Sequence, residues 1–110
     1  MKLVVAIVQP QQLPAIKHAL FGAQIRHLTV TNVLGTAAEG VHMQFRGVSH
    51  EVTLFQKVRI ELAVNDAMVE VAMDAIARGC RDSGGFGFVF VTPLYDAMNV
   101  RSGDRGERAV

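Results

Sequence analysis

The chain has 110 residues, the length of one ordinary domain, because chains below about 150 residues seldom divide into two cores. Half of the residues are hydrophobic and 19% are charged, a balance that excludes a disordered chain and predicts a well-filled core. Eleven basic and ten acidic residues give a formal net charge of +1, without the basic surface that nucleic-acid binding needs. We therefore expect a single domain over 1–110 and no nucleic acid as a partner.

The apolar runs and the single cysteine indicate the cellular compartment in which we expect the protein. No apolar run reaches the roughly 20 residues that cross a bilayer, and the apolar run after Lys2 is too short for a secretion signal. Cys80 is the one cysteine, so it has no partner for an internal disulfide, which fits a reducing compartment. We expect a cytoplasmic protein that does not insert into membranes.

The first half of the chain predicts a strand, a helix and a second strand. Residues 2–8 are β-branched and almost continuously apolar, which is typical of a strand buried on both faces. Pro10 ends this strand, and apolar residues at helical spacing then predict a helix over 11–21 that Gly22 closes, with Pro14 in its first turn. Residues 28–34 are again β-branched and predict the second strand.

A long connection precedes the third strand. Loops this long inside a compact domain are usually functional, so we expect an interaction element here. Apolar and charged residues then alternate from 52 to 64, which predicts a strand with its charged residues on one face: Lys57, Arg59 and Glu61. Asn65 or Asp66 is expected to cap a second helix that ends near Gly79.

The last part of the chain contains a glycine-rich turn at 84–87, a strand over 88–91 that we expect to be buried, and a polar tail. The order strand, helix, strand, strand, helix, strand predicts an α+β, ferredoxin-like βαββαβ sandwich. Because helices cover only one face of such a sheet, the other face is expected to be buried by self-association.

These residues resemble the PII family of nitrogen-regulatory signalling proteins nearly from end to end. The most specific match is the tail sequence VRSGDRGE at 100–107, and LTVTNV at 28–33, FRG at 45–47 and KVRIE at 57–61 also match. The resemblance implies a cytoplasmic homotrimer that is not an enzyme. It also implies a T-loop at about 36–54, a B-loop at about 81–88 and a C-terminal tail at 93–110. Such proteins bind ATP or ADP between subunits, often sense 2-oxoglutarate, and dock the T-loop onto a transporter or an enzyme.

The resemblance assigns a nucleotide-binding role to seven residues. They are Ile7, Thr29, Gly35, Lys57, Gly85, Gly87 and Arg101. The family glutamine that helps to hold a metal bridging ATP and 2-oxoglutarate has no counterpart in Gly35-Thr36-Ala37-Ala38-Glu39-Gly40. Sensing of 2-oxoglutarate is therefore not expected, and no metal is predicted as a cofactor.

Two phosphate-binding cations of the family are replaced. The B-loop lysine becomes Phe88, and the first arginine of the tail pair becomes Asn99, which leaves Arg101. Since a charge-assisted hydrogen bond contributes about 1.5 to 3 kcal/mol, the two losses weaken a triphosphate by roughly 3 to 6 kcal/mol. We expect AMP or ADP as the ligand ahead of ATP. The alternative explanation of the glycines is a tight turn needed for backbone geometry alone.

The T-loop is expected to contact a regulated target protein, and a membrane transporter is the family's usual partner. The residues that it presents are Met43, Phe45, Arg46, Ser49 and His50. In family members that are switched by uridylylation, a tyrosine stands where this chain has His50, so that modification is not expected here.

Two other functions remain open. One is a ligand-independent trimeric adaptor with a vestigial nucleotide site, which Phe88 and Asn99 favour. The other is a metal-responsive trimer that uses His42 and His50, although their spacing is not that of a tight metal site.

Overall fold

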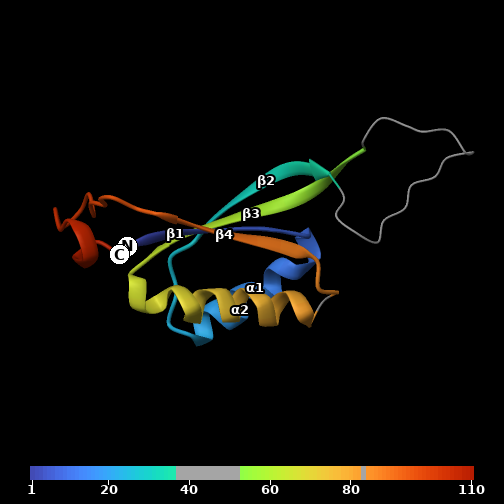
Figure 1. The fold of residues 1–110 in the computed structure, drawn as a ribbon, viewed down its shortest axis with the longest axis horizontal. Helices are drawn as coiled ribbons and strands as arrows, with labels where there is room; N and C mark the ends of the chain where they lie inside the picture. Colours follow the sequence, from blue (N-terminus) through green and yellow to red (C-terminus); the bar gives the residue numbers. More distant parts are fainter. Residues whose placement is uncertain (37–52, 83) are drawn as a thin grey trace, which may run out of the picture.

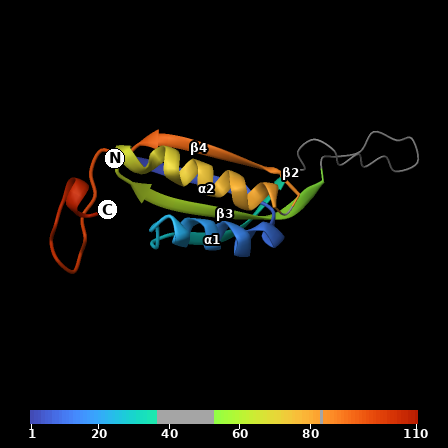
Figure 2. The ribbon, with the colours of Figure 1, turned by 90° about the horizontal axis from the view of Figure 1, so that it is seen from below.

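The structure, a computed structural model, describes residues 1–36, 53–82 and 84–110. Its strands are β1 (Lys2–Val8), β2 (Thr29–Thr36), β3 (Leu54–Val64) and β4 (Gly87–Pro93), and its helices are α1 (Leu13–Gly22) and α2 (Val69–Arg81). The strands form one antiparallel sheet in the order β2-β3-β1-β4. Figure 1 shows both helices on one side of this sheet, and Figure 2 shows them side by side. The predicted α+β ferredoxin-like arrangement is confirmed.

β1 lies between β3 and β4, which explains its almost continuously apolar sequence. Val4, Ala6 and Val8 point toward the helices and are at most 1% exposed. Val5 points to the opposite face and is still only 9% exposed. The prediction of a strand buried on both faces is therefore confirmed for the face toward the helices, whereas on the opposite face Val5 is buried and Leu3 and Ile7 are half-buried.

The two helices approach each other closely at Gly79 of α2. A β-carbon at this position would lie 2.7 Å from the backbone nitrogen and the α-carbon of Ile16 in α1. Glycine is therefore required for the packing of the two helices. The helix was predicted to end near Gly79, and α2 ends two residues later at Arg81. A glycine shortly before a turn resembles a helix terminus in sequence, but its role here comes from a contact with another helix.

A short 3-10 turn precedes each helix, Pro10–Gln12 before α1 and Asp66–Met68 before α2. The first α-helix consequently begins slightly later than predicted, with Pro14 in its first turn as expected. The predicted cap at Asn65 is absent, since this side chain makes no capping hydrogen bond. Its Nδ2 instead donates to the carbonyl oxygen of Glu107 at 3.3 Å, which ties the tail to the end of β3.

Asp66 binds the beginning of the chain instead of capping the helix. Its Oδ1 lies 2.9 Å from the amino nitrogen of Met1 and 3.1 Å from Nζ of Lys2. Hydrogen bonds from the amino group and then from Lys2 hold the pKa of the Asp66 carboxyl below its ordinary value. The carboxyl is largely exposed, so these ion pairs orient the chain end more than they stabilise the fold.

The sheet face opposite the helices is uncovered in the single chain, as Figure 1 shows. Phe88 and Phe90 of β4 lie on this face and are 57% and 53% exposed. Their rings are nearly parallel, with centroids 6.3 Å apart. The prediction of a buried fourth strand was wrong for the single chain, because β4 is an edge strand and these rings have no helix above them. An exposed aromatic pair of this kind is typical of a surface that another chain covers.

None of the helices in the described part of the chain is long and apolar enough to span a membrane.

Candidate functional site

Gly35 and Lys57 lie together at the end of the β2–β3 hairpin from which the predicted T-loop departs. Gly35 pairs with Phe55 and Val33 pairs with Lys57, so all four residues belong to the face opposite the helices. A β-carbon on Gly35 would lie 3.0 Å from Cδ and 3.3 Å from Cε of Lys57. The Lys57 stem therefore crosses directly over Gly35, and the glycine leaves room for it. The structure thus brings two of the predicted site residues into contact.

The glycine-rich turn joins α2 to β4 at the same end of the sheet. Gly84 and Gly85 have φ angles of 115° and 83°, in the left-handed region that glycine adopts without strain. The Gly85 N–H donates to the carbonyl oxygen of Cys80 at 2.7 Å and closes the last turn of α2. This N–H is therefore used within the chain. The positive φ angles explain why these two positions are glycine. A tight turn was the alternative to ligand binding as the explanation of the glycine cluster.

Gly87 begins β4 and is tightly enclosed. A β-carbon here would lie 3.0 Å from Cγ1 of Val8 and 3.1 Å from the carbonyl oxygen of Ile7. Sγ of Cys80 lies 3.6 Å from the position of this β-carbon. Burial raises the pKa of the Cys80 thiol. Gly87 therefore brings the turn close to the end of β1, so that Ile7 and the glycine-rich turn adjoin each other.

The face that carries Lys57 also carries an ion pair and the two phenylalanines. Arg59 and Ile7 are paired neighbours, as are Ile7 and Phe88, so these three side chains form one row across the sheet. Arg59 Nη2 lies 2.6 Å from Oε1 of Glu61 on the same strand. Arg59 is thus neutralised within the chain, whereas Lys57 has no ion-pair partner among the described residues.

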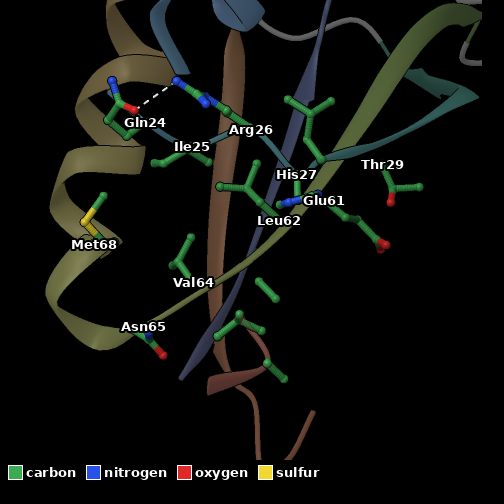
Figure 3. A pocket seen from close by; sticks show the side chains of 14 residues that line it. Gln24, Ile25, Arg26, His27, Thr29, Glu61, Leu62, Val64, Asn65 and Met68 are labelled. Atoms are coloured by element: carbon green, nitrogen blue, oxygen red, sulfur yellow. Dashed lines mark hydrogen bonds between the residues drawn. The ribbon is translucent and has the colours of Figure 1, made fainter. Parts of the chain in front are cut away.

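Thr29 lies at the other end of β2, in a cavity of about 580 Å³ shown in Figure 3. The cavity opens beside β3, just beyond the point where Thr29 pairs with Glu61. Its apolar lining includes Ile25, Leu62 and Met68. Leu62 lies on the helix side of β3, whereas Glu61 and its pairing partner Thr29 lie on the opposite face of the sheet, where the Glu61 carboxylate is bound to Arg59.

Arg101 lies in the tail, beyond the end of the sheet where Lys2 pairs with Pro93. Figure 1 shows that the tail lies at the end of the sheet opposite to the one where β2 ends and β3 begins. The tail is ordered by an ion pair between Asp96 and Arg105, and Arg105 lowers the pKa of that carboxyl. Arg101 itself is exposed.

The predicted nucleotide-binding residues thus form two separate groups in one chain. Ile7, Gly35, Lys57, Gly85 and Gly87 lie at the T-loop end, and Thr29 and Arg101 lie toward the tail end. The six residue steps from Thr29 to Gly35 span about 20 Å of extended strand, which exceeds the length of a nucleoside diphosphate. A single chain therefore does not bring all seven residues around one nucleotide.

A comparison with protein families settles the relationship of the chain. The family model described as nitrogen regulatory protein P-II matches residues 1–104. The chain belongs to the P-II family. The nitrogen regulatory protein P-II of Cereibacter sphaeroides is 38% identical over the full length of both chains. Nitrogen regulatory protein GlnK1 of Methanosarcina mazei is 34% identical over all of this chain and 97% of its own. Nitrogen regulatory protein P-II of Azospirillum brasilense is 34% identical over the full length of both.

The resemblance to nitrogen-regulatory signalling proteins is confirmed by this match, and the P-II relatives are regulatory proteins. The residues predicted to contact a partner lie outside the described residues. They are Met43, Phe45, Arg46, Ser49 and His50. His42 of the metal hypothesis lies outside them as well, and the described residues contain no group of three metal-ligating side chains.

Sequence reasoning missed two residues that lie beside the predicted site residues. Glu61 pairs with Thr29 across β2 and β3, and the alternation of Lys57, Arg59 and Glu61 had already placed it on the outer face. Asn99 was interpreted only as a lost cation, but its side chain shapes the tail at Arg101. An asparagine in a polar sequence is a signal for such a turn, because its side chain can accept a hydrogen bond from the backbone two residues further on.

Proposed function

We propose that this P-II protein is a cytoplasmic signalling trimer whose clefts between subunits bind an adenine nucleotide. The single observation that carries the proposal is the separation of the nucleotide-binding residues into two groups at opposite ends of the chain. Two copies provide both groups around one ligand, with the T-loop end of one copy facing the tail end of its neighbour. The exposed Phe88 and Phe90 provide an apolar surface for such an assembly.

The two groups suit different parts of a nucleotide. The end of β2 at Thr29 receives the base, because apolar residues such as Leu62 and the polar side chains of Thr29 and Glu61 lie close together there. Lys57 and the glycine-rich turn receive the phosphates, together with Arg101 of the neighbouring copy. Phe88 supplies no charge at this end, and the Gly85 N–H is already bonded to Cys80. These features favour AMP or ADP over ATP.

The signal leaves the site through the T-loop, which begins directly after β2 and ends at β3. Gly35 and Lys57 are at its base, so a phosphate bound to Lys57 changes the relative stability of T-loop conformations. The loop then acts on a target protein, for which a membrane transporter is the expected class. The protein thus signals to its target whether the nucleotide is bound, and it catalyses no reaction of its own.

Isothermal titration of the full-length protein with AMP, ADP and ATP tests the nucleotide site. We expect micromolar binding of AMP or ADP and weaker binding of ATP, with no enhancement by magnesium and 2-oxoglutarate. Lys57→Ala is expected to weaken ADP binding about tenfold or more, since it removes a charge-assisted phosphate contact.

Lys17→Ala is the matched control, because Lys17 is an exposed lysine of α1 on the other side of the sheet. It should bind ADP as the wild type does. If all three nucleotides fail to bind to the wild type, the nucleotide site is vestigial, and the ligand-independent adaptor replaces the present proposal.

A further inference from the structure

The tail contains a hairpin whose tip is organised by the side chain of Asn99. Asn99 Oδ1 accepts hydrogen bonds from the backbone N–H of Arg101 at 3.0 Å and of Ser102 at 3.3 Å. The Asn99 backbone also bonds to the other side of the tip, since its N–H donates to the Asp104 carbonyl and its carbonyl accepts from the Gly103 N–H. One residue therefore fixes the backbone on both sides of Arg101.

The base of this hairpin is also stabilised by contacts within the tail. Met98 and Arg105 form an isolated β-bridge, and Arg105 is paired with Asp96. The Gly106 N–H donates to the carbonyl oxygen of Ala97 at 2.9 Å. The hairpin is therefore an ordered element, although most of its side chains are exposed.

Arg101 is presented at this tip without an ion-pair partner among the described residues. Its side chain is exposed, and in the part of the chain that the structure describes no carboxylate forms an ion pair with it. Arg59 and Arg105, by contrast, are each paired with a carboxylate. A cation with a fixed backbone and a free guanidinium loses less freedom when it binds an anion than a cation on a flexible tail does.

We propose that Asn99 is a positioning residue, which holds the backbone of Arg101 so that its guanidinium is preorganised for the phosphate of the ligand. This inference rests on the proposed nucleotide site. The replacement of a cation by Asn99 then has two consequences of opposite sign. It removes one positive charge, which weakens the binding of a triphosphate. It also preorganises Arg101, which strengthens the binding of a ligand with fewer phosphates.

Titration of full-length variants with ADP tests this role. Asn99→Ala removes the accepting oxygen and is expected to weaken ADP binding about fivefold, the effect of one typical hydrogen bond. Asn99→Ser keeps a neutral oxygen that forms the same kind of turn more weakly, so its affinity should fall between those of Asn99→Ala and the wild type. In an Arg101→Ala background, Asn99→Ala should have no further effect, because Asn99 acts through Arg101.

Ser102→Ala is the matched control. Ser102 Oγ accepts the Asp104 N–H at 3.2 Å in the same tip but makes no bond to the Arg101 backbone. Its ADP affinity should equal that of the wild type. The inference is overturned if Ser102→Ala weakens binding as much as Asn99→Ala does, or if Asn99→Ala weakens binding equally with and without Arg101.

Amide hydrogen exchange separates this inference from the proposed function, because it needs no ligand. The Arg101 and Ser102 amides should exchange slowly in the wild type and about fivefold faster in Asn99→Ala. Fast exchange in the wild type would overturn the role of Asn99 even if ADP binds. Slow exchange without any ADP binding would refute the nucleotide site, and the ligand role of Arg101 would fall with it.

Discussion

Gly79→Ala is expected to lower the free energy of unfolding by about 2 kcal/mol. The added methyl group would stand 2.7 Å from backbone atoms of Ile16, so α1 and α2 must move apart. Overpacking of this kind destabilises proteins by about 1 to 3 kcal/mol or more. Alanine has a higher helix propensity than glycine, which offsets about 1 kcal/mol of this overpacking penalty. Urea unfolding followed by circular dichroism measures the difference, at one fixed protein concentration because the proposed assembly would also stabilise the fold.

Gly22→Ala provides the control for this prediction. Gly22 is the last residue of α1, and a β-carbon there would have no atom within 4 Å. Its stability should equal or slightly exceed that of the wild type. Equal unfolding midpoints for Gly79→Ala and Gly22→Ala would show that the close approach of the helices at Gly79 is not required.

Phe88→Lys is expected to strengthen ATP binding about ten- to hundredfold. Phe88 directly follows Gly87 and lies in one row with Ile7, at the end of the sheet where Lys57 has no ion-pair partner in the described part of the chain. A lysine there adds a cation for the terminal phosphate, and one such contact contributes about 1.5 to 3 kcal/mol. AMP has no phosphate at that distance, so its affinity should change little. Parallel titrations of ATP and AMP measure the change in specificity.

Phe88→Leu separates the added charge from the lost ring. It removes the stacked contact with Phe90 but introduces no cation, so the ratio of ATP to AMP affinity should remain that of the wild type. Light scattering on each variant checks that assembly is intact. An equal gain in ATP affinity for Phe88→Leu would mean that the ring blocks the site sterically, and the argument from missing cations would be wrong.

The order of strands and helices could be predicted from the sequence because local signals agree with the fold. The alternation at 57–64 is that of a strand with one buried face, and the continuous apolar run at 2–8 is that of a central strand. Pro14 also marks the first turn of α1 correctly. At these positions the local preference and the tertiary environment require the same residues.

The errors arose where a residue serves a distant part of the structure. Gly79 has the sequence context of a helix end, but its absent side chain admits Ile16 of another helix. Phe88 and Phe90 have the composition of a buried strand, but the surface that would bury them is not part of the same chain. The contact at Gly79 produces no periodic pattern in the sequence, so it could not be predicted, whereas cover of the outer face by a second copy was expected from the order of the elements.

The candidate site was predicted only in part for the same reason. The family resemblance named the residues, but it could not show that Gly35 makes room for the Lys57 stem or that the Gly85 N–H is already bonded. The separation of Thr29 from Lys57 also required the register of β2 and β3. These contacts lead from a family membership to the proposal of a site shared by two copies.

Co-assembly of two defective variants tests this shared site most directly. Lys57→Ala and Arg101→Ala are each expected to bind ADP weakly, because every cleft lacks one cation. When the two chains are refolded together, about a quarter of the clefts should combine an intact Lys57 from one copy with an intact Arg101 from its neighbour. We predict that these clefts bind ADP with the affinity of the wild type. Weak binding throughout, in a mixture shown to contain both chains in one assembly, would contradict the account.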